Sequence, residues 1–342
     1  MTTTNPEWDK ETGGLEVAKA FADRIRGKNG VSPESIGSSI SLSIASQFPA
    51  LLILASRTKH KLDEVLKSIQ HAYPDVTVKT VLLDLMSQES VKAAAKDVSQ
   101  LTDHLDLIIN NAGIMSQQRL WTKEGIEGQF GSNHIGHFLF TNLLVPQLLK
   151  AAPSNPVGST RVVNLTSLGH RLSPVRFSDY NLERLGEKVP PEEMHPDPLP
   201  PMFQQSAADG YNGYVAYGQA KTANILFSVG LNERLGERGI LSYAVHPGSI
   251  WTGLSRDLDP DGEAAIRNTS PFWKNLDQGA ATVLVAALDP SLDRMSLRRV
   301  EPEEILLHDC QLCDAAPYAT DPKISERLWS LSEKLVQKDF KL

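Results

Sequence analysis

The sequence predicts a single α/β domain in which helices cover both faces of a doubly wound parallel sheet. Segments with helical spacing of apolar residues alternate with short apolar runs along most of the chain. The runs 50–55 and 105–109 are almost continuously apolar, which is typical of strands buried on both faces of a sheet. Hydrophobic residues make up 41% and charged residues 22% of the 342 residues, enough apolar material for a sizeable core.

The expected elements follow one another in a regular order. Helices are predicted over 35–47, 59–72, 90–101, 125–150 and 215–238, and strands over 50–55, 76–83, 105–109, 160–166 and 240–245. Residues 171–214 are rich in Pro, Gly and acidic residues, and we interpret them as an insertion over the substrate side, either a lid or a disordered segment. The predicted organisation is an N-terminal extension with a helix (1–29), followed by one catalytic domain (30–342).

Charge and cysteine content narrow the class of protein. The net charge of −7 and the pI near 5.7 argue against attraction to nucleic acid or to an anionic bilayer. Two cysteines cannot form a disulfide framework, so a reducing compartment is the simpler interpretation. The polar, acidic N-terminus has no signal-peptide pattern, and the longest apolar runs are too short to span a bilayer. We therefore expect a cytoplasmic protein without a membrane span.

Tyr217 and Lys221 form the strongest chemical signal. A spacing of four residues places both side chains on one face of a helix, one turn apart. A tyrosine hydroxyl has a pKa of about 10, and an ammonium fixed beside it favours the phenolate, which makes the pair suited to proton transfer. The same spacing is also common in pairs on the surface of amphipathic helices, so the pair alone does not identify a site.

Other polar residues are predicted to meet this pair at one edge of the sheet. Ser167 follows the strand 160–166, the sequence Asn110-Asn-Ala-Gly113 follows the strand 105–109, and His246-Pro-Gly follows the strand 240–245. Open α/β sheets bind their ligands at the carboxyl ends of the strands. Asn133 lies in the long helix 125–150. Several independent features that end on one edge indicate a catalytic site.

Together these segments resemble the short-chain dehydrogenase/reductase family of classical type, and within it the retinol dehydrogenases and WW-domain-containing oxidoreductases. The resemblance extends from about Gly30 to Leu335 and rests mainly on NNAG, SNHIGHF, VVNLTSLGHR, YGQAKTANILF and HPGSIWT. It implies a Rossmann-type fold and a catalytic set of Asn133, Ser167, Tyr217 and Lys221. By this resemblance Tyr217 exchanges a proton with the substrate oxygen and Ser167 hydrogen-bonds that oxygen. Lys221 lowers the pKa of Tyr217 and holds the nicotinamide ribose, and Asn133 positions a water in a proton relay.

The resemblance also predicts a nicotinamide cofactor and the residues that bind it. Arg57 follows the strand 50–55, where NAD-specific relatives carry an acid, and its guanidinium suits a 2′-phosphate. NADP is therefore favoured over NAD, although a solvated surface arginine is the alternative interpretation. The predicted cofactor-binding residues, besides Tyr217 and Lys221, are Gly30, Ser32, Ile36, Gly37, Ser56, Arg57, Asp84, Leu85, Asn111, Ala112, Gly113, Pro247, Gly248, Ile250 and Thr252.

The segment before the predicted phosphate-binding loop departs from the family pattern. Only Asn29 lies between Lys28 and Gly30, where the family has an apolar strand at the centre of the sheet. Its loss would cost about 6–15 kcal/mol, comparable with the whole stability of a domain. The first strand is therefore predicted to be truncated. An upstream segment could fill the gap, the protein could be inactive, or the written sequence could omit residues, which is the explanation that we favour.

The expected function is that of an NADP-dependent oxidoreductase that interconverts an alcohol with a ketone or aldehyde. The similarity to retinol dehydrogenases suggests a lipophilic substrate and is compatible with a homo-oligomer. The alternative is a catalytically impaired relative that binds a nucleotide or acts as a scaffold, motivated by the truncated strand. His308, Cys310 and Cys313 lack a second pair of ligands for a structural zinc, so we predict no metal site there. Tyr211 and Tyr214 are candidates for the substrate pocket or for simple packing.

Overall fold

A computed structural model describes the chain except for residues 1, 34–35, 185–188, 253–259, 294–300 and 302–303. Its described residues form an eight-stranded sheet in the order β3-β2-β1-β4-β5-β6-β7-β8. Each strand is parallel to its neighbours except β8, which is antiparallel to β7. The strands are β1 (Asn29–Pro33), β2 (Leu51–Ser56), β3 (Val78–Leu82), β4 (Leu107–Asn110), β5 (Thr160–Leu165), β6 (Ile240–His246), β7 (Leu306–His308) and β8 (Gln311–Cys313).

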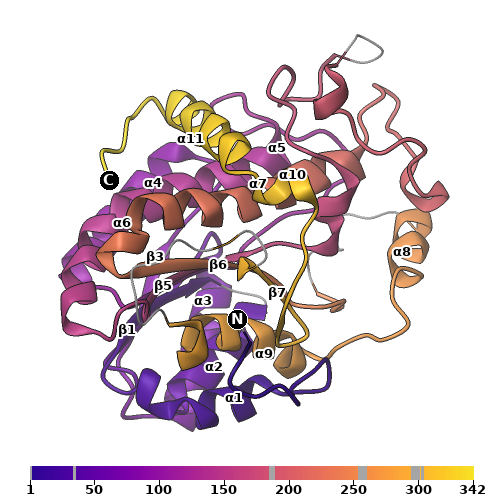
Figure 1. The fold of residues 1–342 in the computed structure, drawn as a ribbon. Coiled ribbons are helices and arrows are strands. Elements are labelled where there is room, and N and C mark those ends of the chain that lie inside the picture. The colour runs from indigo at the N-terminus through magenta and orange to yellow at the C-terminus, as the bar shows by residue number, and fades with distance from the viewer. Residues whose placement is uncertain (1, 34–35, 185–188, 253–259, 294–300, 302–303) are drawn as a thin grey trace.

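Helices cover both faces of this sheet, as the sequence predicts (Figure 1). One face carries α1 (Gly14–Ala20), α2 (Ile36–Ala45), α3 (Lys59–Ala72) and α9 (Leu276–Leu288). The other carries α4 (Gln88–Leu101), α6 (His137–Ala151) and α7 (Gly213–Leu235), with α11 (Pro322–Val336) as a further layer over them. Shorter helices are α5 (Gly128–Phe130), α8 (Pro260–Arg267) and α10 (Pro317–Thr320). The predicted doubly wound parallel sheet is therefore confirmed, with boundaries shifted by a few residues.

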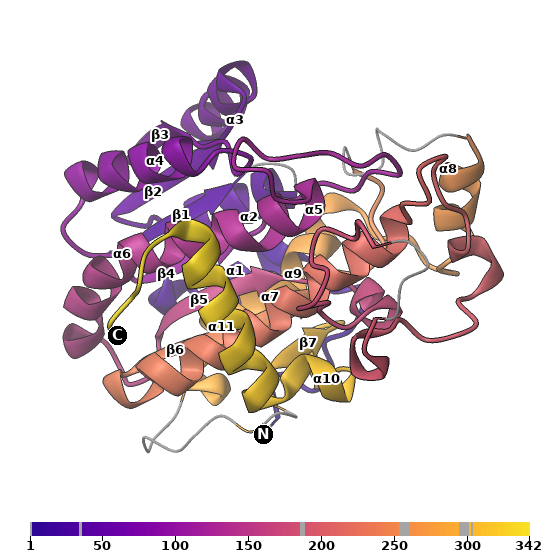
Figure 2. The same ribbon diagram turned by 90° about the horizontal axis from the view of Figure 1, so that it is seen from above.

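Helix α7 is the central scaffold of the site, and its sequence explains its position. Asn212 caps its first turn by accepting hydrogen bonds from the backbone N–H groups of Tyr214 and Val215 at 2.9 and 3.0 Å. Almost every residue of the helix is buried, because the sheet covers one side and α11 covers another. Trp329 of α11 packs against Phe227 of α7 and Phe138 of α6. The helix is therefore held rigidly beneath the C-terminal segment (Figure 2).

The N-terminal residues are packed into the fold. Helix α1 lies against α9 and α2, and its Val17 and Ala18 are fully buried. Trp8 and Phe21 make an edge-to-face contact with ring centroids 5.5 Å apart. Burial of two aromatic side chains and of Val17 contributes several kcal/mol by area, so residues 8–21 belong to the same hydrophobic core as α2 and α9.

The first strand is present, but it is built from unexpected residues. Asn29 to Pro33 pair along their length with β2, while only Gly30 and Val31 are registered with β4. The prediction that a phosphate-binding loop begins at Gly30 and includes Ser32 is therefore wrong, because both residues lie inside β1. Backbone pairing does not require apolar side chains, so this downstream segment can occupy the centre of the sheet where the family has an apolar run.

A partly open cavity of about 140 Å³ lies beside β1. Gly30, Ile44, Leu52, Leu107 and Leu288 are among the residues that line it. A strand with larger apolar side chains would fill such a space, and residual cavities destabilise in proportion to their volume. The short β1 is therefore compatible with the fold, at reduced packing quality.

We predict that Gly30→Ala stabilises the protein by about 0.5–1 kcal/mol. A Cβ at Gly30 would lie 3.7 Å from Leu107, an ordinary van der Waals distance, and would reduce the cavity. Thermal or denaturant unfolding measures the change. The control is Gly27→Ala, which should destabilise because Gly27 has φ +74°. Destabilisation by Gly30→Ala together with loss of NADPH binding would instead return Gly30 to a cofactor loop.

No helix among the described residues combines the length and the apolarity that crossing a membrane requires.

Candidate active site

The predicted catalytic residues converge at the carboxyl ends of the central strands. Ser167 lies two residues beyond β5, Gly113 three residues beyond β4, and Tyr217 and Lys221 in the first half of α7. Asn133 and Lys221 both lie next to Gly113: a Cβ on Gly113 would lie 3.2 Å from Asn133 Oδ1 and 3.6 Å from Lys221 Nζ. The structure thus brings together all four residues that the family pattern names.

Tyr217 is buried beside Ser167 and Gly169. A Cβ on Gly169 would come within 3.2 Å of the Tyr217 ring and 3.5 Å of Ser167 Oγ, so the turn after β5 closes directly over the phenol. Burial raises the pKa of Tyr217 to about 12, and the hydrogen bond with Ser167 opposes this shift. The net direction is opposite to the lowering expected from Lys221, because removal of the phenol from water outweighs any effect of the ammonium.

Lys221 is equally enclosed. Its Nζ donates a hydrogen bond to the Leu165 carbonyl oxygen at 3.1 Å and lies 5.4 Å from the centroid of the Tyr217 ring. Burial lowers the pKa of Lys221 to about 8. The ammonium is therefore fixed in position and can lose its proton near neutral pH, which suits a group that takes part in proton transfer.

Asn133 lies in a π-helix, Gly131–Gly136, that separates α5 from α6. The prediction of one continuous helix over 125–150 is therefore wrong. The Asn133 amide is locked onto Ile114 by two hydrogen bonds, with Oδ1 accepting from the backbone N–H at 2.8 Å and Nδ2 donating to the carbonyl at 2.9 Å. Its own carbonyl oxygen lies 3.0 Å from His137 Nδ1. π-Helical turns frequently occur at functional sites, and this one turns Asn133 toward the segment after β4.

The neighbouring hydroxyl and imidazole groups have structural roles. Thr166 Oγ1 donates to the Lys221 carbonyl oxygen at 2.7 Å, so it satisfies backbone and leaves Ser167 as the hydroxyl beside Tyr217. His170 Nε2 accepts from the Ala316 N–H, which leaves Nδ1 to donate to the Ser167 carbonyl at 2.7 Å. His134 contacts the Ser332 hydroxyl at 2.8 Å within a cluster of phenylalanines.

The predicted cofactor residues are distributed along the same edge. Ser56 ends β2 and the exposed Arg57 follows it, Asp84 and Leu85 follow β3, and Asn111, Ala112 and Gly113 follow β4. Pro247, Gly248, Ile250 and Thr252 follow β6, and Ile36 and Gly37 begin α2. Gly248 has φ +99°, a conformation that favours glycine. The strand order of the sheet changes direction between the neighbours β1 and β4. Open α/β sheets bind dinucleotides at the carboxyl ends of the strands at such a point.

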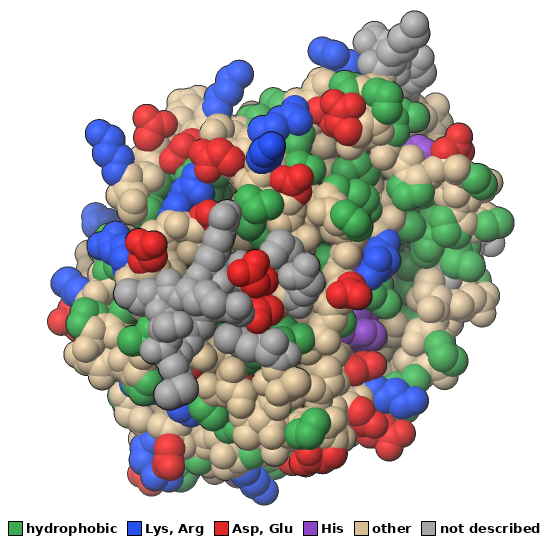
Figure 3. Space-filling model, in the orientation of Figure 1, with side chains coloured by type: hydrophobic (Ala, Val, Ile, Leu, Met, Phe, Trp, Pro, Cys, Tyr) green, Lys and Arg blue, Asp and Glu red, His purple; other side chains and the backbone are tan. Residues whose placement is uncertain are grey.

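Sequence reasoning missed most of the apolar wall next to Tyr217. Met115 and Tyr214 form a buried cluster with Tyr217, and Leu172, Phe203 and Ile266 pack against it. Phe203 belongs to the insertion and Ile266 to α8, two segments that lie together at one side of the molecule (Figure 1). Hydrophobic side chains gather around a hollow on the same side (Figure 3). Their positions depend on irregular backbone, which carries no periodic pattern in the sequence.

The insertion 171–214 is anchored where the structure describes it. Arg119 donates to the carbonyl oxygens of Asn181 and Leu182 at 2.5 and 2.9 Å. Tyr211 donates its hydroxyl proton to the buried Glu127 carboxylate at 2.8 Å and accepts from Gln129 Nε2 at 2.9 Å. Tyr211 is thus a structural residue, whereas Tyr214 lies in the apolar cluster beside Tyr217.

The C-terminal His308, Cys310 and Cys313 have structural surroundings. Cys310 is buried, and its backbone N–H donates to Thr282 Oγ1 at 3.1 Å. Burial raises the pKa of both thiols to about 11, so both are protonated at neutral pH. Within the residues that the structure describes, no group of three or more His, Cys, Asp or Glu side chains is arranged to hold a metal ion.

Comparison with known proteins agrees with this geometry. The family model described as short chain dehydrogenase matches residues 32–181. The chain is 34% identical to short-chain dehydrogenase TIC 32 A, chloroplastic, of Brassica napus, over 84% of this chain and 81% of that protein. It is also 34% identical to retinol dehydrogenase 11 of Mus musculus, over 84% of this chain and 78% of that protein. A crystal structure of an uncharacterised protein from Mycobacterium paratuberculosis superposes with a TM-score of 0.63 at 26% identity, over 93% and 96% of the two chains. The chain therefore belongs to the short-chain dehydrogenase family of oxidoreductases.

Proposed function

We propose that this protein is an NADP-dependent oxidoreductase that interconverts a lipophilic alcohol with its ketone or aldehyde. The observation that carries the proposal is the shared enclosure of Tyr217, Ser167, Lys221 and Asn133 at the carboxyl edge of the sheet. The nicotinamide cofactor supplies the hydride, and the chain supplies orientation and proton management.

The residues around Gly113 and Gly248 fit a nicotinamide nucleotide. Gly113 leaves a space bounded by Asn133 Oδ1 and Lys221 Nζ, which a Cβ would fill. In this arrangement Lys221 holds the ribose hydroxyls, while the segments 111–113 and 247–252 form the walls of the cofactor site. Asp84 would contact the adenine, and its Oδ1 accepts from the Met86 N–H at 3.0 Å, which fixes the turn after β3.

Tyr217 is the proton donor in the reductive direction. Because burial raises its pKa to about 12, the phenol is protonated at neutral pH and can donate to a developing alkoxide. Ser167 hydrogen-bonds the same oxygen and stabilises its charge. Lys221, with a pKa of about 8, then returns a proton to Tyr217 from its fixed position one helical turn away. The relay through Asn133 stays a prediction.

The apolar wall next to Tyr217 supports a lipophilic substrate. Met115, Phe203, Tyr214 and Ile266 offer a hydrophobic surface within reach of the phenol. The test is NADPH oxidation against a panel of apolar and polar ketones and aldehydes. The proposal expects turnover that rises with the apolar surface of the substrate. Binding of NADPH without turnover of any carbonyl compound would contradict it.

We predict that Arg57→Ala weakens NADPH binding by about 10–100-fold and leaves NADH binding nearly unchanged. Arg57 is exposed just after β2, and a guanidinium bound to a 2′-phosphate contributes about 1.5–3 kcal/mol. Affinities from nucleotide fluorescence measure both effects, and Arg57→Lys, which keeps the charge, should retain part of the preference. Equal losses for the two nucleotides would remove the phosphate assignment.

The second candidate is a catalytically impaired relative that binds a nucleotide or acts as a scaffold. The observation that favours it is β1, whose residues Gly30 to Pro33 come from the segment expected to form the phosphate-binding loop. A shift in melting temperature with NADPH separates the two candidates, since a ligand that binds the native state raises it in proportion to occupancy. A cytoplasmic location and a homo-oligomer stay predictions.

A further inference from the structure

An ion pair between a buried lysine and a partly exposed aspartate lies next to the loop that follows β6. Lys274 Nζ is 2.7 Å from Asp309 Oδ1, and the lysine side chain is only 2% exposed. Neither residue belongs to the predicted catalytic set, and no sequence pattern indicates that the two would pair. A buried ammonium is costly unless a partner compensates its charge, so the position of Asp309 determines whether Lys274 can remain there.

Lys274 is joined to the loop through its backbone as well as its side chain. Its N–H donates to the Ser249 carbonyl oxygen at 2.9 Å, and it forms a parallel bridge with Ile250. Its aliphatic stem lies so close to Gly248 that a Cβ there would come within 2.6 Å of Cδ and 2.7 Å of Cε. Gly248 at φ +99° therefore rests directly on the lysine side chain.

Asp309 is held by a turn that most residues avoid. The hairpin between β7 and β8 has two central residues, Asp309 and Cys310, with φ of 47° and 65°. Such turns favour Asn, Asp or Gly, and a non-glycine residue in the left-handed region carries a conformational cost. The Cys310 N–H is fixed to Thr282 of α9 at 3.1 Å, which anchors the turn. Strained backbone that the surrounding structure maintains is frequently found at functional sites.

Two imidazoles complete the surroundings of the pair. His308 Nε2 lies 3.3 Å from Asp309 Oδ1, and the His308 ring stacks on His246 with centroids 4.5 Å apart. Burial holds the pKa of His246 well below its usual range, so this ring is neutral at physiological pH. Among the residues that the structure describes, the carboxylate of Asp309 is thus the anion that pairs with Lys274.

We propose that the Lys274–Asp309 pair is a positioning device that holds residues 247–250 in the conformation that receives the nicotinamide end of the cofactor. This inference rests on the proposed function for the identity of the ligand. Lys274 contacts Gly248 and Ser249 of this loop, and its ion pair with Asp309 fixes the position of the lysine side chain. Loss of the pair frees Gly248 to sample other conformations and leaves the proton-transfer residues Tyr217 and Ser167 in place.

The experiment compares Lys274→Met and the double variant Lys274→Met/Asp309→Asn, in which asparagine removes the charge and suits the left-handed turn, with the wild type. The double variant removes both charges and so avoids an unpaired carboxylate, which keeps the test valid if the single variant fails to fold. Lys96→Met, a change at an exposed lysine of α4, is the matched control. Hydrogen exchange of the peptide that contains residues 247–250 is measured on the protein without nucleotide. NADPH affinity and steady-state kinetics follow.

The proposal expects exchange at 247–250 to accelerate by about 10-fold or more in the folded variants, with NADPH affinity reduced by about 10-fold. The apparent KM for NADPH should rise by more than kcat falls, and Lys96→Met should match the wild type. A folded double variant whose exchange at 247–250 equals that of the wild type overturns the proposal. Because exchange requires no cofactor, it tests the pair even if the wild type proves unable to reduce any carbonyl compound.

Discussion

Tyr217→Phe should reduce kcat for carbonyl reduction by about 10²–10⁴-fold while leaving NADPH affinity nearly unchanged. The phenol is the proposed donor beside Ser167, and its burial keeps it protonated at neutral pH. Phenylalanine preserves the ring that packs against Met115 and Tyr214, so the pocket should keep its shape. Steady-state rates with saturating NADPH and fluorescence titration of the nucleotide measure the two effects.

A matched tyrosine separates chemistry from folding. Tyr211→Phe removes a buried hydroxyl that donates to Glu127 and accepts from Gln129, so it should destabilise the protein by about 1–3 kcal/mol. Its turnover per folded molecule should remain close to that of the wild type, because this hydroxyl is engaged away from the Tyr217 cluster. If Tyr217→Phe retained the wild-type kcat, the phenol would have no role in proton transfer.

The convergence of the candidate catalytic residues could be predicted because each is tied to a regular element. Ser167 and Gly113 follow apolar strands, and parallel strands bring their carboxyl ends to one edge. Tyr217 and Lys221 lie four residues apart on a helix, a spacing that survives small errors in helix boundaries. Where local pattern and global fold agree in this way, sequence alone places a residue within a few ångströms of its partners.

Contacts between segments distant in the sequence could not be predicted. Phe203 and Ile266 reach the Tyr217 cluster from irregular or short segments, and Lys274 meets Asp309 only because β6 and β7 are neighbours. The π-helix around Asn133 spans only Gly131–Gly136, and the spacing of apolar residues over so short a segment does not distinguish it from an α-helix. The direction of the Tyr217 pKa likewise depends on burial, which the spacing of Tyr217 and Lys221 does not reveal.

The first strand shows a different limit of sequence reasoning. Composition correctly indicated that residues before Gly30 lack an apolar strand, and pairing of β1 with β4 is confined to two positions. The composition could not show that the strand would instead be formed by the residues that follow, Asn29 to Pro33. Residues 29–33 form a strand because they hydrogen-bond to the backbones of β2 and β4 on either side. This tertiary effect overrides the low strand propensity of the segment.

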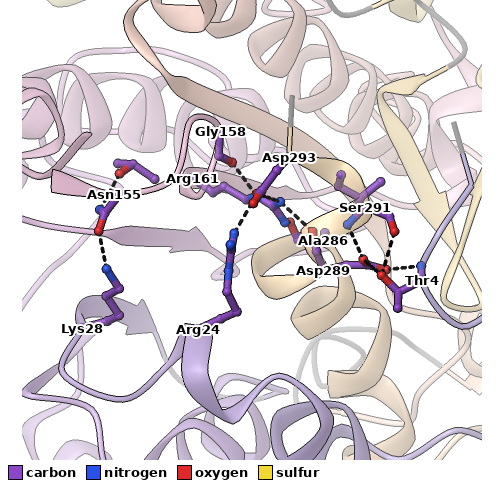
Figure 4. A network of polar contacts seen from close by, with 12 residues as sticks. Thr4, Arg24, Lys28, Asn155, Gly158, Arg161, Ala286, Asp289, Ser291 and Asp293 are labelled. Atoms are coloured by element: carbon purple, nitrogen blue, oxygen red, sulfur yellow. Dashed lines mark hydrogen bonds and ion pairs between the residues drawn. The ribbon is translucent and has the colours of Figure 1, made fainter. Parts of the chain in front are cut away.

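The opposite edge of the sheet carries the largest expected effect on stability. Arg161, at the start of β5, is fully buried, and its guanidinium donates to the carbonyl oxygens of Gly158, Ala286 and Asp289 at 2.7–2.9 Å (Figure 4). It also pairs with Asp293 at 2.6 Å, and Arg24 approaches the same carboxylate oxygen at 2.7 Å. One side chain therefore joins β5 to the end of α9 and, through Asp293, to the N-terminal segment.

Arg161→Met should lower the free energy of unfolding by about 3–5 kcal/mol, because it leaves three backbone carbonyls and part of a buried carboxylate without their donor. Denaturant unfolding followed by circular dichroism measures the change. Ser167 lies six residues further along the same chain, roughly 20 Å away at the rise of a β-strand, so turnover per folded molecule should persist. A proportional loss of stability and of turnover per folded molecule would show that the two edges are coupled.

Arg26→Met is the control for this prediction. Arg26 pairs with Asp23 at 3.5 Å, but the two side chains are 64% and 96% exposed, so the change should stay within about 0.5 kcal/mol. A comparable loss in both variants would mean that net charge, rather than the buried network, controls stability. If Arg161→Met were as stable as the wild type, the carbonyls of Gly158, Ala286 and Asp289 would have to find other donors, which requires the junction between β5 and α9 to rearrange. Burial thus makes Arg161 important for stability. Arg161 lies at the amino ends of the strands, whereas the proposed proton-transfer residues lie at their carboxyl ends, so we expect its loss to affect stability and not catalysis.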